Sequence, residues 1–246
     1  MIYRLGVNVD HIATLRNARG EGHPNPILYA QQIMKFGADS ITIHLREDRR
    51  HINDKDLQIF SNNRKIPINL EMAANNEMLK IALKHKPDFV CIVPEKRNEI
   101  TTEGGLNLSK NKKKILQIIK ELNQNNIRTS LFIDPKKKDV FLAKELNSNC
   151  IELHTGRFAL NVKNKKNYSN EFNNIKNSTL YAKSLGLEVH AGHGLDYKST
   201  MILKKIPFIE EYNIGHFIIG ESIMYGLNKV VLKFKNIIKK WLLEMV

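Results

Sequence analysis

The sequence predicts an α/β protein whose parallel sheet closes into one (β/α)8 TIM barrel, and three observations lead to that prediction. Short runs rich in β-branched residues alternate with segments of helical periodicity. The alternation repeats eight times within 246 residues, and such alternation requires a parallel sheet. No change of composition marks a boundary, so we expect one domain over residues 1–246. An open doubly wound sheet is the alternative, but the count and spacing favour a barrel of ~250 residues.

The eight expected strands are short apolar runs bounded by polar residues or glycine. In chain order they occupy residues 3–9, 40–45, 66–72, 88–93, 127–133, 150–154, 187–191 and 212–219.

The expected helices follow from capping residues and from apolar positions spaced three and four apart. Asn25 and Pro26 begin the first helix, because Asn caps a helix and Pro suits its first position, and Gly37 ends it. Residues 156–170 are expected to form a polar loop rich in Lys and Asn. The other helices start near 53, span 75–85, follow a loop over 94–109, open at 134–135, run through 172–185, span 197–205 and end the chain over 223–242.

The composition excludes a disordered chain and leaves the strong positive charge to be explained. Hydrophobic residues make up 42%, and 39 Lys+Arg against 25 Asp+Glu give a net charge of +14. Such a charge invites a nucleic-acid-binding interpretation. The lysines, however, fall in scattered runs on or beside expected helices, without the interleaved aromatic residues of a stacking platform. We therefore expect a solvated surface and no nucleic-acid partner.

Cysteine usage and hydropathy predict a cytoplasmic protein. Cys91 and Cys150 both lie in apolar contexts, which favours core packing over catalysis or metal binding. No apolar stretch approaches the ~20 residues of a membrane span. The first ten residues lack the basic-then-apolar order of a signal peptide.

Chemically active side chains gather where the expected strands end, which is where barrels place their functional groups. Imidazoles exchange protons near neutral pH, and carboxylates hold their tautomer or act as bases. Glu71 and Glu152 stand on expected strands, where a buried charge needs a partner or a role. A lone histidine here is more often structural, but the number of them predicts a proton-transfer site. Seven of the nine histidines belong to this set, namely His11, His44, His51, His154, His190, His193 and His216.

Glycines near the last two strand ends suggest phosphate binding, although a plain tight turn fits almost as well. Residues 192–194 (GHG) and 215–216 (GH) would expose backbone N–H groups there. Arg19, Arg46 and His51 could bind a second phosphate. Arg49 and Arg50 either join them or pair with the neighbouring acidic residues. Residues 101–105 (TTEGG) fit a mobile lid or an ordinary surface loop.

The same residues resemble the pyridoxine 5′-phosphate synthase family. The resemblance runs in order from residue 5 to about residue 226. Its motifs are LGVNVDHIATLRNARG at 5–20, TIHLREDRRH at 42–51, NLEM at 69–72, VPEKR at 93–97, TTEGG at 101–105, ELHTG at 152–156, AGHG at 191–194 and NIGH at 213–216. It implies a (β/α)8 barrel with extra helices, an octamer built from dimers, and no cofactor or metal. The implied reaction joins 1-deoxy-D-xylulose 5-phosphate and 3-amino-2-oxopropyl phosphate, the last ring-forming step towards vitamin B6.

The resemblance also implies roles for individual residues. His44 and Glu71 match general bases, His193 matches a general acid, and Glu152 matches a carboxylate that stabilises the transition state. The matches to the deoxyxylulose phosphate site are Asp10, His11, Arg46, His51 and Thr101. The matches to the aminooxopropyl phosphate site are Asn8, Arg19, Gly194, Gly215 and His216, and the arginine is implied to reach across a dimer.

Three features depart from the family pattern. The loop over residues 157–170 is long, and His190 stands where a polar residue such as Asn is expected. Glu221 lies near an expected helix start, where its charge would oppose a phosphate, so the contacts are expected at Gly215 and His216 instead.

A metal-dependent barrel hydrolase using Asp10 and the histidines as ligands is the competing enzyme class. The chain lacks a His-x-His pair at the end of its first strand, and nearby arginines would oppose a cation.

Overall fold

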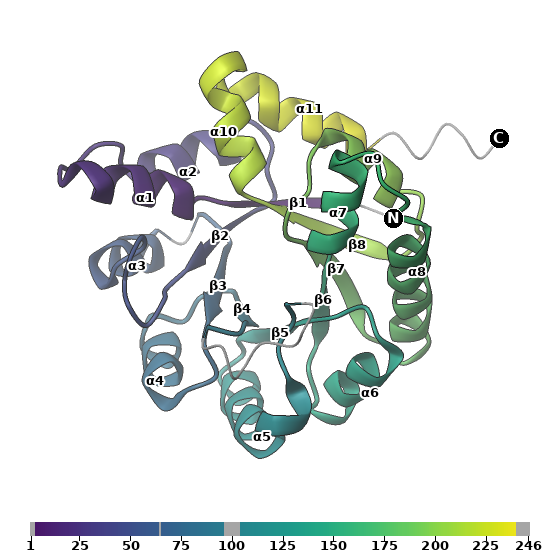
Figure 1. Cartoon of the computed structure of the whole chain (residues 1–246). Helices are drawn as coiled ribbons and strands as arrows, with labels where there is room; N and C mark the ends of the chain where they lie inside the picture. Colours follow the sequence, from purple (N-terminus) through teal and green to yellow (C-terminus); the bar gives the residue numbers. More distant parts are fainter. Residues whose placement is uncertain (1–2, 64, 96–103, 240–246) are drawn as a thin grey trace.

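The computed structural model describes residues 3–63, 65–95 and 104–239. Within them eight parallel strands pair in sequence order, and the last pairs with the first to close a barrel (Figure 1). This confirms the predicted (β/α)8 fold. The strands are β1 (Arg4–Asn8), β2 (Ser40–His44), β3 (Ile68–Met72), β4 (Phe89–Ile92), β5 (Arg128–Ile133), β6 (Cys150–His154), β7 (Glu188–Gly192) and β8 (Ile209–Ile214).

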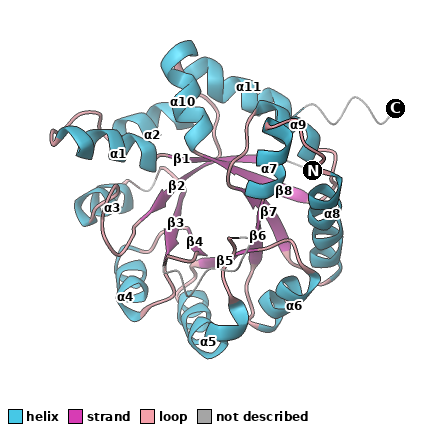
Figure 2. Ribbon diagram, in the orientation of Figure 1, coloured by secondary structure: helices cyan, strands magenta, loops and turns pink. Residues whose placement is uncertain are grey.

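The helices form a ring outside the strands (Figure 2). They are α1 (Asp10–Arg19), α2 (Pro26–Lys35), α3 (Asp54–Asn62), α4 (Asn76–His85), α5 (Leu108–Gln124), α6 (Lys137–Glu145), α7 (Gly156–Lys163), α8 (Ser169–Ser184), α9 (Tyr197–Leu203), α10 (His216–Tyr225) and α11 (Leu227–Lys239).

Side-chain caps define where several helices begin. The side chain of Asn25 accepts a hydrogen bond from the backbone of Ile27, with Pro26 at the first helical position, as the sequence predicted. Asn53 and Asp56 form a reciprocal capping box at the start of α3. Asn75 caps α4 in the same way, by accepting from the backbone of Met78, so the expected starts near residues 25, 53 and 75 are confirmed.

Two helices occupy segments for which the sequence predicts no helix. α1 directly follows β1 and ends at Gly20, whose φ of 75° closes it in a left-handed cap. α7 lies inside the expected polar loop, because Phe158, Ala159 and Val162 share one buried face of a short helix.

The end of the chain also differs from expectation. β8 is Ile209–Ile214 rather than residues 212–219, and the apolar run after it begins α10. Periodicity cannot separate strand from helix in so short an apolar run. The expected single last helix is two helices, because Gly226 has a φ of 85° and separates α10 from α11. Glu221 consequently lies inside α10, and the helix starts beside Gly215.

Apolar and polar positions alternate along the strands. Leu5 and Val7 on β1 are fully buried in the hydrophobic core. The alternate positions carry Arg4, Gly6 and Asn8. Arg4 bonds to side chains of β7 and β8 across the barrel interior. Cys91 and Cys150 are also buried, in agreement with the predicted packing role.

Candidate active site

A cavity of about 890 Å³ opens at the carboxyl ends of the strands. This is the end at which barrels place their functional groups. Ten of its lining residues belong to the predicted set or to the histidines noted beside it: Asn8, His11, His44, Glu71, Glu152, His154, His193, Gly194, Gly215 and His216.

Asp10 joins the ends of the first two strands. Its Oδ1 accepts a hydrogen bond of 2.9 Å from the backbone N–H of His44, and its Oδ2 accepts one of 2.8 Å from Asn8 Nδ2. Burial raises the pKa of Asp10 to about 6, and the bond from the His44 backbone opposes that shift. This carboxyl therefore titrates close to neutral pH.

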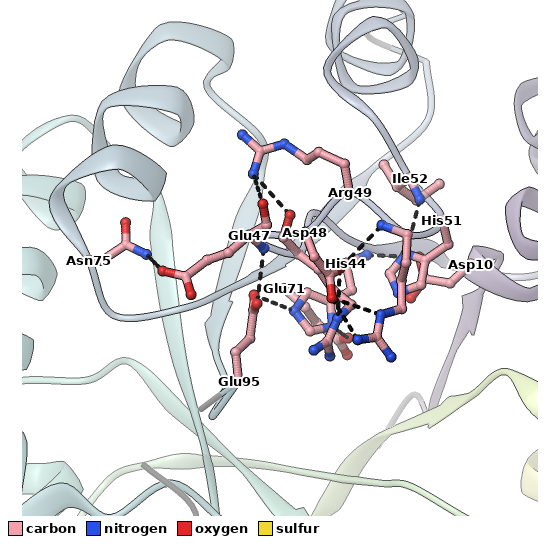
Figure 3. Close-up of polar contacts among 12 residues, drawn as sticks. Asp10, His44, Glu47, Asp48, Arg49, His51, Ile52, Glu71, Asn75 and Glu95 are labelled. Atoms are coloured by element: carbon pink, nitrogen blue, oxygen red, sulfur yellow. Dashed lines mark hydrogen bonds and ion pairs between the residues drawn. The ribbon is translucent and has the colours of Figure 1, made fainter. Parts of the chain in front are cut away.

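His44 lies between two glutamates, as Figure 3 shows. Its Nε2 is 3.0 Å from Glu95 Oε1, and its Nδ1 is 3.8 Å from Glu71 Oε2. Burial would raise the pKa of Glu95, but the hydrogen bonds from His44 and from the backbone of Glu47 lower it overall. An ionised Glu95 orients the imidazole, so the other ring nitrogen faces Glu71 and the cavity.

His51 is held as a neutral ring with a defined tautomer. Its Nδ1 accepts a hydrogen bond of 2.9 Å from the backbone N–H of Ile52, so Nε2 carries the proton. Burial, together with a smaller effect of the neighbouring His44, lowers the pKa of His51 to about 4. The ring therefore presents an N–H donor over the whole neutral range.

Glu71 and Glu152 approach the cavity from β3 and β6. Burial raises the pKa of Glu71 well above its usual value, and the charges of Glu152 and Asp10 add to that effect. Burial also raises the pKa of Glu152 to about 7, against the opposing charge of His190 and the hydrogen bond from Asn213. Two such carboxyls supply both a proton acceptor and a proton donor near pH 7.

Two strand glycines create the space that Glu152 and its partner occupy. A Cβ on Gly192 would lie 2.0 Å from Glu152 Oε1, and a Cβ on Gly6 would lie 1.9 Å from Asn213 Oδ1. Asn213 Nδ2 donates a hydrogen bond of 2.8 Å to Glu152 Oε2. Only residues without a side chain at these two positions allow the arrangement.

His193 follows β7 in a left-handed conformation, with a φ of 79°. Its ring centroid lies 5.0 Å from that of His154 and 6.3 Å from that of Phe132. Burial lowers the pKa of His193. Burial and the charge of His193 together lower the pKa of His154 to about 4. An imidazolium formed at either ring would release its proton readily.

The start of α10 closes another side of the cavity. Gly215 caps the helix, and a Cβ there would lie 2.8 Å from Asn8 Cβ, so glycine allows the close approach. The rings of His216 and His11 lie 5.1 Å apart. Free N–H groups and the helix dipole favour an anion at this end. The contacts expected at Gly215 and His216 therefore coincide with a helix amino terminus that the sequence analysis placed elsewhere.

Among the predicted binding residues that the structure describes, Arg19 and Arg46 do not line the cavity, and Asp10 and His51 lie beside it in contact with His44. Arg19 ends α1 with 77% of its side chain exposed, and it pairs with Glu21. Arg46 lies in the loop after β2, where its Nε is 3.4 Å from Asp48 Oδ1. Thr101, and the proposed lid except its two glycines, lie outside the described residues.

Arg49 and Arg50 both form ion pairs with acidic side chains, which is one of the two alternatives that the sequence allows. Arg50 pairs with Asp48 at 2.6 Å. Arg49 pairs with Asp54 and Glu77 rather than with the Glu47 carboxylate.

Asp10, His44 and His51 form the one group, within the described part of the chain, whose spacing could hold a metal ion. Asp10 Oδ1 already accepts the His44 N–H, and His51 Nδ1 already accepts the Ile52 N–H. Asp10 Oδ1 and His51 Nδ1 thus already accept hydrogen bonds from the backbone, which weakens the case that they are metal ligands.

Three residues of the site carried no assigned role in the sequence analysis. They are Asn213, His154 and Glu95. The last strand was expected over residues 212–219, so Asn213 was placed inside that strand and not near its carboxyl end, where it lies in β8. Glu95 directly follows the strand β4 region, and that position was the signal that could have identified it.

The fold and the cavity define a barrel enzyme that combines paired carboxyls, imidazoles and a helix amino terminus. Comparison with known families is specific: the model of the pyridoxal phosphate biosynthesis protein PdxJ matches residues 5–240. The chain belongs to this family.

Curated relatives are similar to this chain over nearly their whole length. The pyridoxine 5′-phosphate synthase of Pelagibacter ubique is 59% identical over 96% of this chain and 99% of its own. The enzymes of the same name from Zymomonas mobilis and from Wolbachia pipientis are 49% and 48% identical, over 94% and 96% of this chain and 90% and 100% of their own.

Solved structures support the fold alone. The tryptophan synthase A-subunit of Pyrococcus furiosus has a TM-score of 0.60 at 12% identity, over 97% of this chain and 98% of that one.

The described helices include none long and apolar enough to cross a membrane.

Proposed function

We propose that this chain condenses 1-deoxy-D-xylulose 5-phosphate with 3-amino-2-oxopropyl phosphate, as the ring-forming step of vitamin B6 biosynthesis. The products are pyridoxine 5′-phosphate, inorganic phosphate and water. The family membership supports the reaction. The observation that carries the assignment of the site is the convergence of Glu71, Glu152, His44 and His193 on one cavity beside the start of α10.

The reaction needs several proton transfers, and the cavity has groups for each. The amine of one substrate attacks the ketone of the other, and the resulting imine forms only when water leaves with a donated proton. Loss of phosphate requires a base that removes a proton from carbon. Glu71 and His44 are the proposed bases, because a raised pKa strengthens the carboxylate and Glu95 orients the imidazole.

His193 is the proposed general acid, and Glu152 the carboxyl that stabilises the charge of the transition state. The lowered pKa of His193 favours release of its proton. Asn213 fixes the direction of Glu152, so the carboxyl needs no rearrangement during the reaction. Each step is an addition, an elimination or a proton transfer, so the proposal invokes no cofactor and no metal.

Two phosphates need two separate binding regions. We assign the aminooxopropyl phosphate to Asn8, Gly194, Gly215 and His216, at the start of α10. We assign the deoxyxylulose phosphate to Asp10, His11, Arg46, His51 and Thr101. The fixed Nε2–H donor of His51 and the charge of Arg46 suit an anionic or hydroxyl-bearing ligand.

The experiment follows inorganic phosphate and the absorbance of the pyridoxine product with both substrates present. We expect both signals, each lost when either substrate is omitted. Glu71→Gln keeps the shape and removes the base, so turnover should fall about 10²- to 10⁴-fold. Glu77→Gln, an exposed residue paired with Arg49, is the control and should retain full turnover. Phosphate release without ring formation, or full activity in Glu71→Gln, would contradict the proposal.

We further propose that the single catalytic domain, residues 1–246, assembles in the cytoplasm as an octamer built from dimers. Support comes from exposed apolar side chains on α1 and α10: Leu15, Ile223, Met224 and Tyr225. These helices contact each other, and Arg19 lies at the end of α1, where a partner could receive it. Light scattering of the purified chain tests the assembly, and a monomer at micromolar concentration would overturn it.

The partners in this proposal are the two phosphorylated substrates, not nucleic acid. Random duplex DNA should bind weakly, and tight binding with a steep dependence on salt would contradict this part.

A further inference from the structure

A cluster of charged side chains surrounds His190 on β7, below the cavity. The imidazole is buried, with 6% of the residue exposed. Its Nε2 lies 2.8 Å from Glu188 Oε1, and its Nδ1 lies 3.8 Å from Glu211 Oε1. The Arg4 guanidinium also lies 3.2 Å from this Nε2 and opposes a positive charge there, whereas the carboxylate beside each ring nitrogen favours the doubly protonated ring.

The charges of the cluster balance only when Glu152 is included. Arg4 bonds to both Glu188 and Glu211, and Arg128 pairs with Glu188. Those two guanidinium groups and two carboxylates cancel. A protonated His190 then adds one positive charge, for which Glu152 is the remaining carboxyl in the neighbouring strand.

The register of the sheet places these two residues side by side. His190 of β7 pairs with Glu152 of β6, and it pairs on its other side with Glu211 of β8. Glu152 therefore has His190 on the neighbouring strand on one side, and it also lines the cavity, which His190 does not. A charge on the imidazole acts on the site without touching a substrate.

We propose that His190 is a positioning residue that supplies the counter-charge for Glu152. Its imidazolium favours the ionised form of Glu152, and the charge of Glu152 in turn makes Glu71 a stronger base. The consequence for the rate rests on the proposed function, whereas the ionisation of Glu152 does not.

The ionisation of the facing groups agrees with this geometry. Burial lowers the pKa of His190, but Glu211, Glu188 and Glu152 raise it overall. The charge of His190 lowers the pKa of Glu152 against the larger effect of burial. The charged and titratable groups around the pair are Arg4 from β1, Glu71 from β3, Cys91 from β4, Arg128 from β5, Cys150 from β6, Glu188 from β7 itself and Glu211 from β8.

The test replaces the charge but keeps a hydrogen-bond donor, with His190→Gln. We expect the acidic limb of the kcat/KM profile to move up by about one pH unit or more, because Glu152 loses an opposing charge. Below that limb the variant should be roughly tenfold slower, while kcat above it is retained. His85→Gln is the matched control, since His85 bonds Ser61 on the outside of the barrel and should leave the profile unchanged.

A second measurement does not depend on turnover. Infrared titration follows the protonated carboxyl band of Glu152, assigned by its loss in Glu152→Gln. We expect the band to persist to higher pH in His190→Gln than in the wild type. An unmoved Glu152 titration overturns the inference, whether or not the enzyme is active.

The two proposals therefore fail separately. A shifted titration in a protein that makes no pyridoxine product supports the role of His190 and rejects the reaction. His190→Asn, a smaller side chain, provides the same comparison if the Gln variant does not fold, as judged by circular dichroism.

Discussion

At the scale of single residues, the position of Glu152 depends on neighbours that carry no chemistry of their own. Gly192 leaves room for its carboxyl, and Asn213 donates to it. Burial then raises its pKa to about 7. Burial on the strand thus moves the titration of an ordinary glutamate towards neutral pH, while the missing side chain and the amide set the direction of its carboxyl.

Gly192→Ala tests this dependence. The added Cβ would lie 2.0 Å from Glu152 Oε1, so the carboxyl must leave the bond with Asn213. We expect kcat to fall about 10- to 100-fold with the fold retained, because a misdirected charge stabilises the transition state poorly. Gly22→Ala is the control, since no heavy atom lies within 4 Å of its added Cβ. Unchanged kcat in Gly192→Ala would exclude a fixed role for this carboxyl.

The pH dependence of stability gives a second test at Glu152. Its folded pKa, about 7, lies above the ordinary 4.5, so the folded state binds more protons between these values. The wild type should therefore lose stability relative to Glu152→Gln as the pH rises from about 4.5 to 7. At ~1.4 kcal/mol per pKa unit the difference reaches roughly 3 kcal/mol. Urea unfolding of both proteins at several pH values measures it, and a constant difference would contradict the raised pKa.

At the scale of elements, the last helix is tied to the beginning of the sheet. Lys235 of α11 is 6% exposed and pairs with Asp39, which also accepts a hydrogen bond of 2.7 Å from the backbone of Leu5. Val231 and Phe234 of the same helix are fully buried. The ion pair and the apolar face together hold α11 against β1 and the residue that leads into β2.

Lys235→Met should therefore destabilise the protein. Removing one partner leaves the Asp39 carboxylate without its cation, which costs about 3 kcal/mol in a buried pair and less here because Asp39 is partly exposed. Lys229→Met changes an exposed lysine on the same helix and should cost under about 0.5 kcal/mol. Denaturant unfolding compares the two variants, and equal stabilities would show that the pair contributes nothing.

At the scale of the whole molecule, the net charge of +14 is the main feature that no single site explains. A positive field raises the rate at which anionic ligands reach a cavity, and salt screens that field. Both proposed substrates are phosphate esters, so their capture should depend on ionic strength.

We expect kcat/KM to fall about two- to tenfold between low salt and roughly 0.5 M salt, with little change in kcat. The reason is that salt screens the attraction that brings the anionic substrates to the cavity, whereas it does not reach the proton transfers inside it. Steady-state kinetics in potassium chloride measure the effect, with circular dichroism as the check that the fold is intact. A kcat/KM independent of salt would mean that the charge serves another purpose.

The sequence by itself determined the barrel, most strand positions and the residues at the strand ends. Period-two and period-3.6 patterns, caps such as Asn25 and Asn53, and the rule that parallel strands end at one rim were sufficient. Those local signals do not depend on distant parts of the chain. They place His44, Glu71 and Glu152 at one end of the barrel.

Tertiary structure decided what local patterns leave ambiguous. The apolar run after residue 214 became a helix because the strand before it fills the last place in the barrel, and that helix start now borders the cavity. His190 turned out to lie inside the barrel, between Glu188 and Glu211, and not at the rim. Its neighbours are distant in sequence, and a charge has meaning only beside the groups that oppose it, so only the folded chain reveals its partner.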